Sequence, residues 1–235
     1  MTEHTLKQFD IDLDRIRRGV LQMGGMVEAQ FTKALEGLRS GDMASIEAAI
    51  EADKSVNLEQ IRLDDACTHI IAKHQPTARD LRLLLTVIKT VSDLERVGDE
   101  AKKIAKAARR LHANDTTSPP KVGLSHATQL ALEMLRSALD GFARGDAGEI
   151  DAIRLKDTEV DSDFKGITRQ LITYMVEDPR TITSSLELLF IAKAIERIGD
   201  HALNIAEHVV YMVSGEDVRF TKAQASGMNG TEARP

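Results

Sequence analysis

Proline occurs in only four places in this chain of 235 residues, and this distribution constrains the fold more than any other feature. The prolines are Pro76, the adjacent Pro119 and Pro120, Pro179 and Pro235. Because proline interrupts helices and strand ladders, the long stretches between these positions can form uninterrupted helices. Aromatic residues make up only 3% of the chain, too few for the aromatic-rich faces of β sandwiches and barrels. The sequence therefore predicts an all-α protein.

Apolar residues recur at intervals of three or four along most of the chain, which is the pattern of amphipathic helices. The first such run extends from Leu6 to Leu38. Gly41 can then provide the left-handed residue that ends a helix, and Asp42 can cap the next one. The same pattern along the rest of the chain predicts six helices. Their approximate ranges are 1–40, 42–74, 77–112, 123–143, 146–176 and 180–213.

The second half of the chain repeats the first at a separation of about a hundred residues. The segment Glu-Arg-aliphatic-Gly-Asp occurs at 95–99 and again at 196–200, and Pro76 is matched by Pro179. Short connections between helices require antiparallel neighbours. Each half therefore predicts one antiparallel three-helix bundle.

This repeat defines the domain organisation that we expect, which is two tandem antiparallel three-helix bundles. The first bundle covers 1–113 and the second covers 123–214. Residues 114–122 are polar and contain the proline pair, as is typical of a linker. Residues 215–235 are polar without a helical pattern, and we expect them to form a mobile tail.

Charge and cysteine content exclude several classes of protein. The chain has 37 acidic and 31 basic residues and a net charge of −6, so no nucleic acid partner is expected. Its single cysteine, Cys67, cannot form an internal disulfide and is expected to pack as a small buried apolar residue. The N-terminus has no secretion-signal pattern, and no stretch approaches the length of a membrane span. These features predict a cytoplasmic protein.

The repeated Glu-Arg-aliphatic-Gly-Asp segment is unfavourable for a surface helix. Its two acids repel each other at i and i+4, and a glycine inside a helix costs about 1 kcal/mol relative to alanine. The sequence offers no packing reason for either choice. A segment that breaks local rules without a structural gain is where function is expected.

The hairpin geometry gathers these acids. Residues equidistant from a hairpin turn lie side by side, and Pro76 is the midpoint between Asp53 and Asn57 on one helix and Glu95 and Asp99 on the next. In the second half, the acids of the two neighbouring helices lie at similar distances along the chain from the turn at Pro179, so they too are expected to lie side by side. The candidate metal ligands are Asp53, Asn57, Glu95 and Asp99 in the first half and Asp157, Asp161, Glu196 and Asp200 in the second.

Clustered carboxylates would raise one another's pKa values and destabilise the fold unless a cation neutralised them. Oxygen ligands suit hard ions such as Mg²⁺, Mn²⁺, Ca²⁺ or Fe³⁺, and Zn²⁺ is also compatible. Chance alone supplies about six acid pairs at this helical spacing in such a chain. The spacing of the acids alone is therefore compatible both with a metal site and with an ordinary solvent-exposed helix face.

The motifs together make the chain resemble the PhoU family of phosphate-uptake regulators over essentially its full length. The matching segments are 19–24 with Val27 and Glu28, 75–82, 177–180, and the two Glu-Arg-aliphatic-Gly-Asp copies, the second extended to Glu207. The resemblance implies two pseudo-symmetric three-helix bundles whose acidic motifs bind multinuclear clusters of iron or zinc on the bundle surface. Asn57 departs from the acidic pattern, so the first site is expected to be weaker or to hold fewer ions.

The resemblance also implies a regulatory function and no catalytic residue. Such a protein acts in the cytoplasm between the ATPase of the phosphate ABC transporter and a sensor histidine kinase, and it keeps the phosphate-starvation response off when phosphate is plentiful. We expect a negative regulator that is a homodimer and is peripheral to the membrane through its partners.

Two other functions remain open at this stage. One is a carboxylate-bridged metal enzyme, either a phosphohydrolase or an oxidase, although no histidine follows an acid in the Glu-x-x-His spacing of ferritin-like oxidases. The other is a metal-free helical adaptor. His201 and His208 could lend nitrogen ligands to a cluster or be ordinary surface or interface histidines.

One basic cluster has no assigned role. Its members, near the end of the third helix, are Lys102, Lys103, Lys106, Arg109 and Arg110. They could complement the helix dipole, or they could form a docking surface for an acidic partner or the membrane face.

Overall fold

The computed structural model describes residues 2–113 and 119–218, with side chains described from residue 7 onward. Its described part contains helices and no strands, which confirms the all-α prediction. The helices are α1 (Thr2–Ser40), α2 (Met43–His74), α3 (Ala78–Ala113), α4 (Ser125–Arg144), α5 (Ile150–Glu177), the short 3₁₀ helix η1 (Pro179–Thr181) and α6 (Ile182–Ser214). Most of the predicted tail, 219–235, and part of the predicted linker, 114–118, lie outside the described residues.

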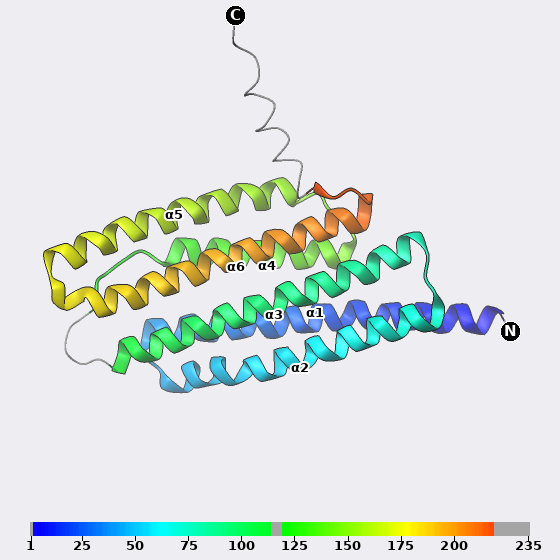
Figure 1. Ribbon diagram of the computed structural model, residues 1–235, viewed down its shortest axis with the longest axis horizontal. Coiled ribbons are helices and arrows are strands. Elements are labelled where there is room, and N and C mark those ends of the chain that lie inside the picture. The colour runs from blue at the N-terminus through cyan, green and yellow to red at the C-terminus, as the bar shows by residue number, and fades with distance from the viewer. Residues whose placement is uncertain (1, 114–118, 219–235) are drawn as a thin grey trace, which may run out of the picture.

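The helices form two antiparallel three-helix bundles that lie side by side (Figure 1). Helices α1, α2 and α3 pack against one another, as do α4, α5 and α6. Helices α3 and α6 pack along each other in the middle of the molecule and join the bundles, with a smaller contact between α1 and α4. The buried apolar side chains of both bundles form one continuous core, which is built mainly from aliphatic residues.

The end of α1 follows the sequence prediction. Gly41 has a φ of +73°, which is the left-handed conformation that favours glycine. The carboxylate of Asp42 accepts hydrogen bonds from the backbone N–H groups of Ala44 and Ser45, both at 3.1 Å, and so caps α2.

The predicted start of the fifth helix at 146 is wrong by four residues, because α5 begins at Ile150. Asp146 instead completes the end of α4, where its N–H donates to the carbonyl of Gly141 at 2.9 Å. Together with the left-handed φ of +63° at Gly145, this bond is the Schellman arrangement of a helix C-terminus. The Asp146 carboxylate accepts from the N–H of Gly148 rather than capping α5.

The two hairpin turns set the register of the helices that carry the acidic motifs. The first turn has positive φ angles at Gln75 (+47°) and Ala78 (+45°), on either side of Pro76. The second turn uses Pro179 at the start of η1. Both prolines therefore lie in the hairpin turns, as the repeat predicts.

Candidate functional site

The first acidic cluster lies where α2 and α3 run side by side. The ammonium nitrogen of Lys102 is 2.6 Å from Asp53 Oδ2 and 4.0 Å from Asp99 Oδ1. Burial raises the pKa of Glu95, and the neighbouring charges of Asp99 and Asp53 raise it further. The structure therefore brings Asp53, Glu95 and Asp99 together. These residues lie at similar distances along the chain from the Pro76 turn, as the register of an antiparallel hairpin predicts.

Two oxygen atoms of this cluster are buried without a partner. Asp53 is only 2% exposed, and its Oδ1 atom has no hydrogen-bond donor among the residues that the structure describes. The same holds for Oδ1 of Asn57, one helical turn later. Buried acceptors without donors are uncommon in folded proteins. A cation held by these oxygens would satisfy them.

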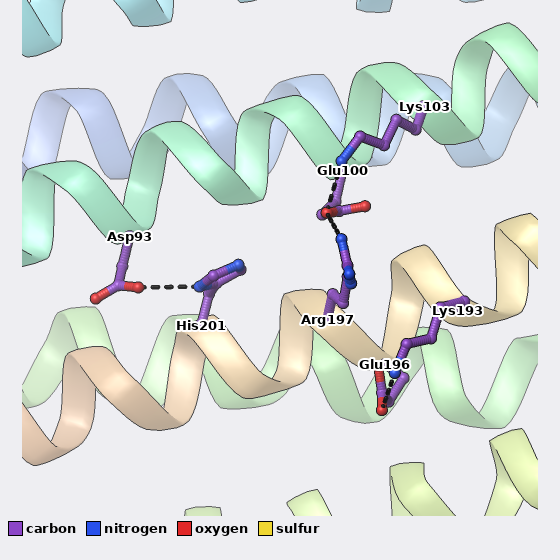
Figure 2. Close-up of polar contacts among 7 residues, drawn as sticks. All are labelled: Asp93, Glu100, Lys103, Lys193, Glu196, Arg197 and His201. Atoms are coloured by element: carbon purple, nitrogen blue, oxygen red, sulfur yellow. Dashed lines mark hydrogen bonds and ion pairs between the residues drawn. The ribbon is translucent and has the colours of Figure 1, made fainter.

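The second acidic cluster lies between α5 and α6. Burial raises the pKa of Asp200, and the charge of Glu196 adds to the increase, with a smaller contribution from Asp161. Lys193 Nζ donates to Glu196 Oε1 at 2.6 Å (Figure 2). The other carboxylate oxygen of Glu196 is buried without a hydrogen-bond partner in the described part of the chain. Asp157 is half-buried on α5, one helical turn before Asp161.

Neither cluster is arranged to hold a metal ion in its present side-chain geometry. Within residues 2–113 and 119–218, no group of three or more His, Cys, Asp or Glu side chains could do so. Lysine ammonium groups offset part of the negative charge instead, Lys102 beside Asp53 and Asp99 in the first cluster and Lys193 beside Glu196 in the second. The donor chemistry, with oxygen ligands and unpartnered buried oxygens, fits a hard cation. Such a cation would replace the ammonium groups.

Gly98 has a packing reason that the sequence did not reveal. A Cβ atom at this position would lie 3.1 Å from Gln30 Oε1 and 3.3 Å from Val56 Cγ1. The Gln30 side-chain amide donates to the Gly98 carbonyl at 3.0 Å and to the Ala49 carbonyl at 3.1 Å, which ties α1 to both α2 and α3. The expectation that this glycine has no structural purpose is wrong. The matching Gly199 has only ordinary contacts, the nearest at 3.6 Å.

A buried polar network joins α3 to α6. Asp93 Oδ1 lies 2.9 Å from His201 Nδ1, and Asp93 Oδ2 lies 2.9 Å from His208 Nε2 (Figure 2 shows the first contact). Burial would raise the pKa of Asp93, but the hydrogen bonds and charges of the two histidines lower it to about 2. Asn204 donates to the same carboxylate at 3.4 Å.

This network answers the question that the two histidines raised in the sequence. His201 and His208 hold Asp93 at the junction of the bundles, so the structure gives them an interface role. Asp93 could not be predicted from the sequence, because it belongs to no motif or spacing pattern in its own segment. The available signal was the spacing of seven between the histidines, which places both on one face of a helix.

An open cleft of about 600 Å³ lies between the two clusters along α3 and α6. Its lining includes one candidate ligand from each cluster, Asp99 and Asp200, and the arginines of the two repeated motifs, Arg96 and Arg197. Glu100 also lines it, and Figure 2 shows the carboxylate of Glu100 between Lys103 and Arg197. The two candidate sites therefore border one shared cleft, in which acids and bases are balanced.

The basic cluster at the end of α3 is divided among several neighbours. Lys102 pairs with Asp53 of α2, and Arg109 donates to Glu47 of α2 at 3.0 Å. Arg110 forms two hydrogen bonds of 2.6 Å with Glu187 of α6. These contacts cross-link the helices, which neither alternative from the sequence anticipated.

Comparison with known proteins places these features in context. The PhoU domain matches residues 20–108 and 124–209. The chain is 45% identical to the phosphate-specific transport system accessory protein PhoU of Serratia marcescens, over 96% of this chain and 92% of that protein. It is 44% identical to the protein of that name from Escherichia coli K12, over 93% of this chain and 90% of that protein.

Solved structures agree with these sequence matches. The crystal structure of PhoU from Pseudomonas aeruginosa has a TM-score of 0.85 at 40% identity and covers 88% of this chain and 100% of that chain. The phosphate transport system regulatory protein PhoU from Streptococcus pneumoniae has a TM-score of 0.80 at 30% identity, covering 89% and 99%. None of the described helices combines the length and apolar composition needed to cross a membrane.

Proposed function

The chain belongs to the PhoU family, and on that premise we propose that it is an accessory protein of a phosphate-specific transport system that regulates phosphate uptake. The observation that carries this proposal is that both halves match the PhoU domain and that each half gathers carboxylates of its repeated acidic motif beside the neighbouring helix. The relatives are named as accessory or regulatory proteins and not as enzymes, which confirms the expectation of a protein without catalytic activity.

The more detailed proposal is a cytoplasmic adaptor and negative regulator. It would bind the ATPase of the phosphate ABC transporter and a sensor histidine kinase, and it would reach the membrane only through these partners. A helical rod with charged and apolar side chains exposed along its length offers surfaces for more than one partner. A homodimer is part of the same proposal, and Leu58 and Ile61 on α2, both exposed, are available for such a contact.

Metal binding is the second part of the proposal. Asp53, Glu95 and Asp99, with Asn57, would hold an ion in the first half. Asp157, Asp161, Glu196 and Asp200 would do so in the second. Iron or zinc clusters are expected, with Mg²⁺ or Mn²⁺ as other hard ions that suit oxygen donors. A bound cation would reduce the repulsion among these carboxylates and lower the raised pKa values of Glu95 and Asp200.

A metal-free helical adaptor is the alternative that a specific observation favours. Lys102 already offsets part of the negative charge of the first cluster without an ion, since it contacts both Asp53 and Asp99. Metal analysis of protein purified without chelators separates the two candidates. The double variant Glu196→Ala, Asp200→Ala then tests whether the second cluster matters, since loss of regulation with normal metal content would exclude a role through the ion.

The regulatory function is tested in a deletion strain grown in excess phosphate. We expect alkaline phosphatase expression, a reporter of phosphate starvation, to be high in the deletion strain and low again when the intact gene is restored. A pull-down with the transporter ATPase and the histidine kinase, with and without excess phosphate, tests the partners. Failure of both partners to bind under either condition would contradict the adaptor function.

A further inference from the structure

A second groove, of about 460 Å³, continues along the junction of the bundles from the cleft described above. We call it the basic groove. It is lined by Lys103, Lys106 and Arg110 of α3 and by Phe190, Lys193 and Arg197 of α6. Its volume is within the range of about 300–1,000 Å³ that is typical of ligand pockets. Of these six residues, Lys193 also pairs with Glu196 of the second acidic cluster, and the other five are neither candidate metal ligands nor part of the Asp93 network.

Positive charge exceeds negative charge in the basic groove. Five of its lining residues are cations. Glu100 Oε1 is shared between Lys103, at 2.8 Å, and Arg197, at 3.2 Å (Figure 2). Lys106 has no ion-pair partner among the residues that the structure describes. The acids that pair with the groove cations are Glu100, Glu187 and Glu196. Five cations therefore meet three acids, on a chain whose net charge is −6.

The helix dipole does not account for these cations. Its effect is confined to the last turn of a helix. Arg110 lies in the last turn of α3, but Lys103 lies well before it. Lys193 and Arg197 lie in the middle of α6, which extends from Ile182 to Ser214. The concentration of cations therefore follows the groove and not the helix end.

An exposed apolar stripe adjoins the cations. Phe190, which lines the groove, is 61% exposed. Leu186 and Ile182 follow at intervals of four residues along α6 and are 40% and 41% exposed. Residues at this spacing share one face of a helix, and the three side chains span about 12 Å at 1.5 Å per residue. Large apolar side chains that remain exposed in line are typical of an interaction surface.

We propose that the basic groove and its apolar stripe bind an acidic amphipathic segment of a protein partner. Carboxylates of the segment pair with Lys106 and with Lys103 and Arg197, which share the single acid Glu100. Its apolar side chains cover Phe190 and the stripe. This is recognition of an amphipathic helix by a groove, with charge complementarity setting its orientation. The inference rests on the proposed adaptor function and assigns a surface to one of its contacts.

An anionic membrane could in principle satisfy similar chemistry, because basic and apolar side chains also mark surfaces that bind lipid. The arrangement favours a peptide. The cations line the walls of a concave groove between two helices, where a segment can enter between them, whereas a bilayer presents a flat surface.

The test uses the full-length protein and labelled synthetic peptides of about 14 residues, long enough to form about four helical turns. One peptide places leucine at i, i+4 and i+8 among glutamates. A scrambled peptide has the same composition, and vesicles containing phosphatidylglycerol provide the lipid arm. Fluorescence anisotropy measures binding, and circular dichroism checks that each variant is folded.

The variants are Lys106→Glu and Phe190→Ser, with Lys54→Glu on the exposed face of α2 and Ile172→Ser on the exposed face of α5 as matched controls. We expect the amphipathic peptide to bind about tenfold more tightly than the scrambled one, a difference of about 1.4 kcal/mol. Each groove variant should lose about fivefold or more in affinity while the controls stay within about twofold. Binding should also weaken as salt is raised.

Equal binding of the two peptides, or equal binding by wild type and groove variants, would overturn the proposal. If the groove variants lose binding to the vesicles and the protein does not discriminate between the two peptides, the surface is assigned to lipid instead. The phosphate-starvation reporter is read separately. Failure of the reporter test with intact peptide discrimination contradicts the adaptor function and leaves the groove assignment standing.

Discussion

The carboxylate of Asp93 lies 2.9 Å from Nε2 of His208, and both side chains are buried where α3 of the first bundle meets α6 of the second. The residues are 115 positions apart. Their contact fixes how the bundles pack, because a buried polar group must keep its partner to offset the cost of burial.

Replacement Asp93→Ala should therefore destabilise the protein. It leaves His208 buried without a hydrogen-bond partner, which costs about 1–3 kcal/mol. Urea unfolding at neutral pH measures the loss. The control is Asp163→Ala, which removes the contact of 2.7 Å with the exposed His126 and should cost less than about 1 kcal/mol. Equal losses in the two variants would show that the network adds nothing to stability.

The two motif glycines should respond differently to alanine. Alanine inside a helix is more favourable than glycine by about 1 kcal/mol. Gly199→Ala should realise most of that gain, because its Cβ meets only Met134 and Val160 at ordinary distances. Gly98→Ala should be neutral or destabilising, because Gln30 and Val56 would have to move. Urea unfolding of the two variants makes the comparison, and equal stabilisation of both would contradict the packing argument.

Lys102→Met should reveal the cation requirement of the first cluster. Loss of the ammonium group leaves the buried Asp53 carboxylate unpaired, which should destabilise the protein by about 1–3 kcal/mol. Addition of Mn²⁺ or Zn²⁺ should restore the lost stability if an ion can take the place of Lys102. Thermal unfolding with and without metal measures both effects.

The matched control for this test is Lys54→Met, next to Asp53 in the sequence. Lys54 is 73% exposed and pairs with Glu51, so neither its loss nor the added metal should change stability greatly. A Lys102→Met protein that is destabilised and gains nothing from any tested ion would count against metal binding at this cluster.

Cys67 should be unreactive in the folded protein. Burial raises the pKa of its thiol to about 12, with a smaller contribution from the charge of Asp64. The thiolate is the reactive form. At pH 8 about one thiol in ten thousand is ionised, so a disulfide reagent should modify the folded protein very slowly and the urea-unfolded protein rapidly. A Ser55→Cys variant, exposed on α2, provides the fast-reacting control, and rapid labelling of folded Cys67 would contradict its burial.

The same shift has a defined effect on stability at high pH. The usual pKa of the thiol is 9.0, and folding raises it. The folded state therefore favours the protonated form, so the stabilisation is complete below pH 9 and is lost as the pH rises toward about 12. Replacement Cys67→Ala should remove this part of the alkaline loss of stability, which urea unfolding between pH 8 and 11 would detect.

Several elements could be predicted from short stretches of sequence. The helix end at Gly41 and the cap at Asp42 depend on residues within one helical turn, and the structure has both. The convergence of Asp53 with Glu95 and Asp99 follows from counting residues about Pro76, since an antiparallel hairpin has a fixed register. The start of α5 was misplaced because Asp146 is used by α4, a choice that depends on a bond back to Gly141.

The helices, the duplicated bundles and the convergence of the acids could be predicted from the sequence, because helical periodicity, capping and hairpin register are local properties of the chain. Which charges meet depends on the packing of the helices. It placed Lys102 against Asp53, gave Asp93 both histidines, and distinguished Gly98 from Gly199 by the approach of Gln30. These outcomes depend on how separate helices pack side by side, and side-chain contacts between distant segments leave no periodic signal in the sequence.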